Sequence, residues 1–378
     1  MRRGALAALL LLLALLTGCA HAGEVENQAY ALVLGVEAGN GGGIALTIRI
    51  PRIGKRGGAE DAGEEPYLLL SAEGDSYVQA LERLQWATAR ELNLSHLKLI
   101  IVSRALAASE PFPALIRQIA QTRHLYTTAG FIVCEGSAKA FIEGQQTILG
   151  TRMSSEISAM FRHYAAHGYI PHAAFADLYY ATLSGGSDPT GIWGFLDSGE
   201  PSQQTREAAA IIGGDEDGLR QSAQTASSRQ YLGAAVLRDG RLVTHLDARE
   251  TLYLNLLTEN LDSFSYAHGG RDYTLACMRR PKQTVRLDGD RVTVGVTLWL
   301  SCEDAASEAA LKALAEDMSG ALAAMIRRCQ QAGIEPFGFT EHAAARFLTV
   351  DAWQRFNWRS RWPSADVEVR VHIAGSGN

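Results

Sequence analysis

The sequence predicts a multi-domain protein of mixed α/β (α+β) class, in which mixed sheets pack against helices. In the first half, short apolar runs alternate with amphipathic helical segments, which is typical of α/β architecture. In the second half, strands joined by Asp-Gly turns precede one long amphipathic helix. That pattern predicts a C-terminal domain with an antiparallel sheet against one long helix.

The amino terminus carries a short apolar run with a cysteine at its end. Two arginines precede residues 5–16, which are too few to span a bilayer core that needs about 20. Residues 1–18 are therefore predicted to be a signal peptide. The Leu-Thr-Gly-Cys motif that ends at Cys19 resembles a bacterial lipobox, and the resemblance implies that the Cys19 sulfur receives a diacylglyceryl group. A plain secreted protein with an incidental Cys19 is the alternative.

The bulk composition is that of a globular protein. About half of the residues are apolar (47%) and 20% are charged, over 378 residues, which favours two or three domains. Loss of Arg2 and Arg3 with the signal peptide lowers the basic residues from 35 to 33 and changes the net charge from −6 to −8. This acidic excess argues against a nucleic-acid partner.

Four cysteines remain after Cys19, and none has C-x-x-C spacing, which argues against a zinc site. Cys277 and Cys302 lie near the ends of two neighbouring predicted strands. They are the best-placed pair if a disulfide forms in an oxidising compartment. Buried free thiols are the favoured alternative.

In the N-terminal half, the first strand is followed by a glycine-rich stretch at residues 39–43. Residues 44–50 then alternate between apolar and polar, so we expect a hairpin. A dinucleotide loop is disfavoured because Ile44 breaks the G-x-G-x-x-G pattern. The expected strands are 29–36, 44–50, 67–71, 97–102 and 131–134. A helix is expected after a cap at Asp75 or Ser76, with Tyr77, Val78, Leu81 and Leu84 on one face. Further helices are expected at 111–121, 137–142, 154–167 and 172–183.

In the C-terminal half, Asp247 and Glu250 form a capping-box pattern at the start of a helix. The long helix is expected over residues 305–331, since apolar side chains recur at three and four along it. Its stripe comprises Leu311, Leu314, Met318, Leu322, Met325 and Cys329, and the expected strands are 233–237, 242–245, 273–277, 284–287, 292–300 and 367–373.

Composition divides the mature chain. The segment 198–228 is rich in Gly, Ser, Gln and acidic residues, and we interpret it as a linker or insertion. Residues 19–28 are a tether, 29–197 an N-terminal α/β region that could comprise two subdomains, and 229–378 a C-terminal α+β domain.

Candidate catalytic residues are few. His163 and His167 lie four apart on one predicted helical face, with His172 nearby, but the H-E-x-x-H pattern is absent. Residues 184–188 miss the last glycine of a G-x-S-x-G elbow. Surface or capping roles are therefore favoured for these residues, and we expect no catalytic, cofactor or metal site.

The ordered segments of the chain resemble one known family. The segments that carry the resemblance are Leu32–Val36, Leu46–Ile50, His96–Val102 with Arg123, Gly240–Thr251, Ile334–Phe339, Trp353, Trp358 and Val367–Gly375. Together they resemble the Ger(x)C lipoproteins, the C subunits of bacterial spore germinant receptors. Glu37 stands where many members have Asp, and Thr244-His245, Pro336 and the 198–228 segment also depart from the pattern.

The resemblance implies a three-domain α/β body on the outer face of the inner spore membrane. There it would work beside integral membrane A and B subunits in sensing amino acids, sugars or nucleosides. The family has no established catalytic residues. Direct binding of a small molecule by this chain stays open.

Two other functions are weighed against this one. A lipid-anchored solute-binding protein of a transporter would have two similar lobes, and the sequence has no such duplication. A cell-envelope hydrolase would have to use His163, His167 or the 184–188 region.

Overall fold

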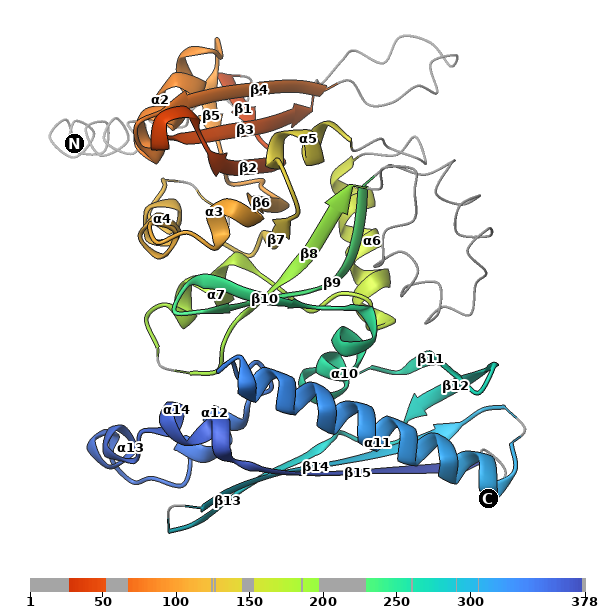
Figure 1. The fold of residues 1–378 in the computed structure, drawn as a ribbon. Coiled ribbons are helices and arrows are strands. Elements are labelled where there is room, and N and C mark those ends of the chain that lie inside the picture. The colour runs from red at the N-terminus through yellow and green to blue at the C-terminus, as the bar shows by residue number, and fades with distance from the viewer. Residues whose placement is uncertain are drawn as a thin grey trace, which may run out of the picture.

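The computed structural model describes residues 27–51, 67–123, 125, 127–144, 153–184, 186–196, 229–259, 261–289, 291–304 and 306–375. They form an eight-stranded sheet, a five-stranded sheet and a two-stranded sheet, with helices packed on them (Figure 1). This mixed architecture confirms the expected fold class. No helix within the described ranges is long and apolar enough to cross a membrane.

The strands run in the following order. They are β1 (Gln28–Tyr30), β2 (Val33–Ala38), β3 (Ile44–Pro51), β4 (Tyr67–Gly74), β5 (Glu91–Asn93), β6 (Leu99–Ser103), β7 (Gly130–Cys134), β8 (Thr190–Leu196), β9 (Arg229–Arg238), β10 (Arg241–Leu246), β11 (Ser263–His268), β12 (Arg271–Cys277), β13 (Lys282–Asp288), β14 (Arg291–Cys302) and β15 (Asp366–Gly375).

The helices alternate with these strands in the first half and cluster in the second. They are α2 (Tyr77–Trp86), α3 (Arg104–Ala107), α4 (Phe112–Ala120), α5 (Ala138–Glu143), α6 (Met153–Ala166), α7 (Phe175–Ala181), α10 (Ala248–Thr258), α11 (Glu308–Gln331), α12 (Phe339–Ala344), α13 (Val350–Phe356) and α14 (Trp358–Arg361).

The eight-stranded sheet has the order β10-β9-β8-β7-β6-β2-β3-β4. Its central strands β8, β7, β6 and β2 are parallel, and an antiparallel hairpin flanks them on each side. Strand β6 is buried along its whole length because both faces of the sheet are covered. Ile100 and Val102 belong to the core under α2, α4 and α7, whereas Leu99 and Ile101 belong to the core under α5 and α6.

The predicted hairpin is confirmed, since β2 and β3 pair antiparallel across the glycine-rich stretch. The single strand expected over 29–36 is divided in two, because β1 ends at Tyr30 and pairs with β5 in the small sheet, whereas β2 begins at Val33 in the eight-stranded sheet. Ser76 caps α2 by accepting from the Gln79 backbone N–H, as the sequence predicts. Val78 was expected on the buried face of α2 but is 56% exposed, so that expectation is wrong; Ala80 is buried instead.

Strands β9 and β10 belong to the N-terminal sheet. We expected residues 229–246 in the C-terminal domain, but β9 pairs with β8 and β10 pairs with β9. The segment 198–228 therefore separates two paired strands of one sheet, and the second large sheet begins only at β11. The segment itself lies outside the described residues.

The five-stranded sheet lies against α11. Its strands β11 to β14 pair antiparallel, which agrees with the expected antiparallel sheet, although β11 itself was not predicted. Strand β15 joins β14 in parallel, which the alternating pattern of β15 does not reveal. Figure 1 shows α11 running along β14 and β15. The predicted apolar stripe of α11 is buried at all six positions.

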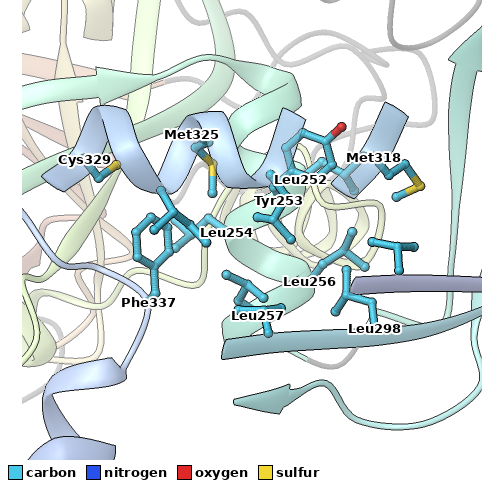
Figure 2. Close-up of a cluster of buried hydrophobic side chains, with 14 of the residues drawn as sticks. Leu252, Tyr253, Leu254, Leu256, Leu257, Leu298, Met318, Met325, Cys329 and Phe337 are labelled. Atoms are coloured by element: carbon cyan, nitrogen blue, oxygen red, sulfur yellow. The ribbon is translucent and has the colours of Figure 1, made fainter. Parts of the chain in front are cut away.

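Helix α10 connects the two large sheets. It is buried on every side: one hydrophobic core holds its leucines together with residues of β9 and β10 from the large sheet and of β14 and α11. Figure 2 shows α10 side chains facing Leu298 of β14 and Met318, Met325 and Cys329 of α11. The Asp247–Glu250 capping box forms at its start as predicted.

A buried asparagine of α10 fixes the loop after α6. The Asn255 side-chain N–H group donates to the carbonyl oxygens of Gly168 at 3.0 Å and Ile170 at 2.9 Å. Gly168 has φ +78°, and a Cβ there would lie 2.7 Å from a methyl carbon of Leu252. The close approach of α6 to α10 therefore requires glycine at this position.

Leu254→Ala tests α10 as a shared core. Leu254 is 1% exposed, so the cavity should lower the free energy of unfolding by about 2–5 kcal/mol. Leu183→Ala is the matched control, because Leu183 is 61% exposed and should change stability by about 0.5 kcal/mol or less. Denaturant titration of the full-length chain in detergent measures both; equal effects would contradict the shared core.

Candidate functional site

A loop of the N-terminal part and a loop of the C-terminal part meet through reciprocal hydrogen bonds. The Asp188 backbone N–H donates to the Glu335 carbonyl oxygen at 2.8 Å, and the Glu335 backbone N–H donates to Asp188 Oδ2 at 2.7 Å. Asp188 precedes β8, and Glu335 lies between α11 and α12. We call this contact the Asp188–Glu335 joint.

The carboxylate of Glu335 is the centre of the joint. It accepts hydrogen bonds from the backbone N–H groups of Phe337 (2.8 Å), Phe339 (3.2 Å) and Thr340 (2.8 Å). The hydroxyls of Thr340 (2.5 Å) and Ser187 (2.8 Å) donate as well. Burial raises the pKa of Glu335 to about 7, although these donors lower it. The side chain organises the whole turn into α12.

Ser187 links two carboxylates. Its hydroxyl oxygen lies 2.8 Å from Glu335 Oε2 and 2.5 Å from Glu341 Oε2, and its backbone N–H donates to Glu341 Oε1 at 2.9 Å. A serine hydroxyl carries one hydrogen, so it can donate to only one of these carboxylates at a time. The Ser187 hydroxyl therefore donates to Glu335 or to Glu341, while its backbone N–H stays bound to Glu341.

Arginines surround Asp188. Arg359 Nη1 donates to Asp239 Oδ1 at 2.6 Å, and its Nη2 lies 3.9 Å from Asp188 Oδ1. Arg238 Nη1 donates to the Gly333 carbonyl oxygen at 2.9 Å. Burial raises the pKa of Asp188 to about 6, opposed by the Glu335 backbone hydrogen bond and by both arginines. The turn between β9 and β10 thus holds α11 and α14 at the same joint.

A cavity of about 180 Å³ opens beside the joint. The buried Trp358 lines it, and its indole N–H has no hydrogen-bond partner among the described residues. The carboxylates of Asp188 and Glu335 and several aromatic rings also line the cavity. The full lining is Gly186, Asp188, Gly333, Glu335, Thr340, Trp353, Gln354, Asn357, Trp358, Arg359 and Trp362.

Of the candidate catalytic residues singled out from the sequence, only Ser187 and Asp188 lie at this joint. Trp353 and Trp358, which carry part of the family resemblance, line the cavity beside it. Cys19 lies outside the described residues, so its lipidation stays a prediction. The His163 and His167 rings lie 4.4 Å apart by their centroids, and His167 Nδ1 lies 2.8 Å from the His163 carbonyl oxygen. Within the described ranges, no three His, Cys, Asp or Glu side chains gather as a metal site.

Cys277 and Cys302 are free thiols in this structure. In the register of β12 and β14, Cys277 lies opposite Leu300 and Cys302 opposite Leu275. The two cysteines are thus diagonal neighbours, typically about 7–8 Å apart, whereas a disulfide needs Cβ atoms about 3.5–4.5 Å apart. Burial raises the pKa of Cys277 to about 11, which keeps the thiol protonated and unreactive.

Asp188→Asn tests the joint through pH. The pKa of Asp188 is raised above its ordinary value of 3.8, so the folded chain keeps a proton that the unfolded chain releases. This contribution to stability is complete below about pH 4 and is lost as the pH rises through about 6. The free energy of unfolding of the wild type, relative to Asp188→Asn, should fall by about 1 kcal/mol over that range, after discounting for partial exposure.

Thermal unfolding of both proteins across this pH range gives the difference directly. Asp272 is an exposed residue of β12, so Asp272→Asn is the control for the removal of an acid far from the joint. If the free energy of unfolding depends on pH in the same way in the wild type and in Asp188→Asn, the pKa of Asp188 is not raised at the joint.

Comparison with known proteins places this chain. Residues 21–190 match the family described as spore germination protein N-terminal domain, and residues 232–375 match the family described as spore germination B3/GerAC-like, C-terminal. Spore germination protein KC of Bacillus subtilis (strain 168) is 27% identical over 139 residues, which are 35% of this chain. That alignment spans only 34% of the relative's length.

The crystal structure of the GerBC protein has a similar fold. The match has a TM-score of 0.52 at 12% sequence identity and covers 91% of this chain and 97% of GerBC. At this identity the likeness concerns the fold alone. Since the two family matches together cover most of the sequence, the chain belongs to the Ger(x)C family of spore germination proteins, as the resemblance of its ordered segments predicts.

Proposed function

We propose that this chain is the lipid-anchored C subunit of a spore germinant receptor and that it acts through contacts and not through catalysis. The observation that carries the proposal is the match of both halves of the chain to the two spore germination domains. The predicted lipobox at Cys19 supports the anchored location, on the outer face of the inner spore membrane.

The anchor would act by raising local concentration. Two acyl chains hold a protein stably at a bilayer, because each buried methylene contributes about 0.8 kcal/mol. A folded body held there meets integral membrane A and B subunits at a high effective concentration, so weak contacts suffice for assembly. The body needs no membrane-spanning helix of its own for this role.

The chemistry of the joint supports a role in contacts. The Glu335 carboxylate is engaged by five hydrogen-bond donors, and the Asp188 carboxylate by the Glu335 backbone. Carboxylates held in this way fix two parts of a fold to one another. A change at either residue would alter how the C-terminal part is presented to a membrane partner.

A second candidate function is solute binding. The cavity beside the joint, which Asp188, Glu335 and Trp358 line, favours it. Calorimetry of the purified full-length chain with amino acids, sugars and nucleosides separates the two functions. Tight binding in the absence of any membrane subunit would favour solute binding.

Cys19→Ala tests the anchor. The variant should fold but leave the membrane fraction, because a thiol at this position is what the lipid attaches to. Cys277→Ala, which removes another thiol, should stay with the membrane. Membrane fractionation and mass spectrometry of the amino terminus measure the outcome. An unmodified wild-type Cys19, or normal membrane retention of Cys19→Ala, would contradict lipid anchoring.

A further inference from the structure

The segment that joins α12 to α13 exposes two large apolar side chains. Leu348 is 102% exposed and Val350 is 68% exposed, relative to an extended reference. We call residues 345–356 the α13 tip. Figure 1 shows α13 as the outermost element at one end of the C-terminal part. Two exposed apolar side chains, two positions apart on a projecting segment, are therefore available to contact a partner surface.

The α13 tip also carries cations that no acid neutralises. Arg346 and Arg355 are exposed and form no ion pair with a carboxylate among the described residues. By contrast, Arg359 nearby is bound to Asp239 at 2.6 Å. The acid of the tip, Asp351, lies in the first turn of α13, where it complements the helix dipole. Free positive charge beside apolar side chains is notable in a chain of net charge −6.

Aromatic side chains hold the tip rigid. Phe347 packs against Trp353 with ring centroids 5.5 Å apart and against Phe356 at 5.0 Å. Trp353 stacks at 6.3 Å on Trp358, which is buried and stacks at 5.9 Å on Trp362 in the core. This continuous aromatic column attaches the tip to the core while Leu348 and Val350 remain exposed, so we expect little ordering of the tip on binding.

We propose that the α13 tip docks on an anionic lipid surface, with Leu348 and Val350 entering the headgroup region and Arg346 and Arg355 contacting lipid phosphates. Apolar tips flanked by arginine, with tryptophan alongside, are the composition of interfacial membrane contacts. A stable protein interface needs about 1,000 Å² or more of buried area, which two apolar side chains do not supply. A shallow lipid contact needs far less when a lipid anchor already holds the chain nearby.

The proposal deepens the proposed function, because it adds a second membrane contact to the expected anchor. Two contacts would fix the orientation of the body at the bilayer, whereas an anchor on a tether alone would leave the body free to rotate. Each arginine near an anionic surface should strengthen the docked state about fivefold.

The test uses the full-length lipidated chain with Leu348→Cys carrying an environment-sensitive fluorophore. The protein is reconstituted into vesicles of phosphatidylcholine alone or of phosphatidylcholine mixed with phosphatidylglycerol. We expect a blue shift of emission with the mixed vesicles only, lost at high salt because screening weakens the arginine contacts. The same fluorophore at Val243→Cys, an exposed position of β10, should show no shift.

Charge variants complete the test. Arg346→Gln with Arg355→Gln should reduce the equilibrium constant for docking about 25-fold, as the product of two fivefold effects. Arg90→Gln with Arg117→Gln removes two exposed arginines elsewhere and should leave the shift unchanged. Sedimentation with vesicles reports the lipid anchor separately. A chain that sediments without any emission shift, or shifts only when membrane subunits are added, would overturn lipid docking and leave the anchor intact.

Discussion

The burial of α10 between the two large sheets is the constraint on which the rest of the structure depends. A helix that faces solvent on one side can shift as its partners move, but α10 has no such side. Its leucines share one core with β9, β10, β14 and α11. The N-terminal and C-terminal parts therefore pack as one body around this helix, and a movement of one part must disturb the packing of the other.

The Asp188–Glu335 joint lies at a second contact between the same two parts. Hydrophobic packing at α10 has no direction, whereas the hydrogen bonds of the joint do. The Glu335 carboxylate accepts hydrogen bonds from its own turn and from Ser187. These bonds fix the turn before α12 to the loop before β8. The aromatic column begins beside this joint and ends at the α13 tip. The arrangement gives a continuous rigid path from the shared core to the exposed surface.

Sequence reasoning predicted features that rest on neighbours along the chain. The β2–β3 hairpin, the Ser76 cap, the Asp247–Glu250 capping box and the apolar stripe of α11 depend on local periodicity and cap chemistry. It failed where distant pairing decides. Strands β8 and β11 were not predicted, and the pairing of β9 and β10 with β8 was not foreseen, because the partners of a strand are not encoded in its own pattern.

The candidate site could not be predicted from the sequence, because it too depends on contacts between distant residues. Asp188 lay in a stretch considered only as a failed nucleophile elbow, and Glu335 lay in a segment noticed only for its family resemblance. Nothing local marks either acid as buried, since their contact spans 147 positions along the chain. Val78 shows the converse limit: an apolar residue at helical spacing was expected to be buried, but no element covers it.

The pairing of Leu196 with Arg229 carries a consequence for how this family can vary. Leu196 and Arg229 lie opposite each other on one rung of the ladder, so the sheet fixes both ends of the connecting segment whatever its length. Doubling such a detour costs about 0.6 kcal/mol of closure entropy. Insertions, deletions and substitutions in this segment should therefore have little effect on stability. A reporter domain inserted there would leave β8 and β9 in register.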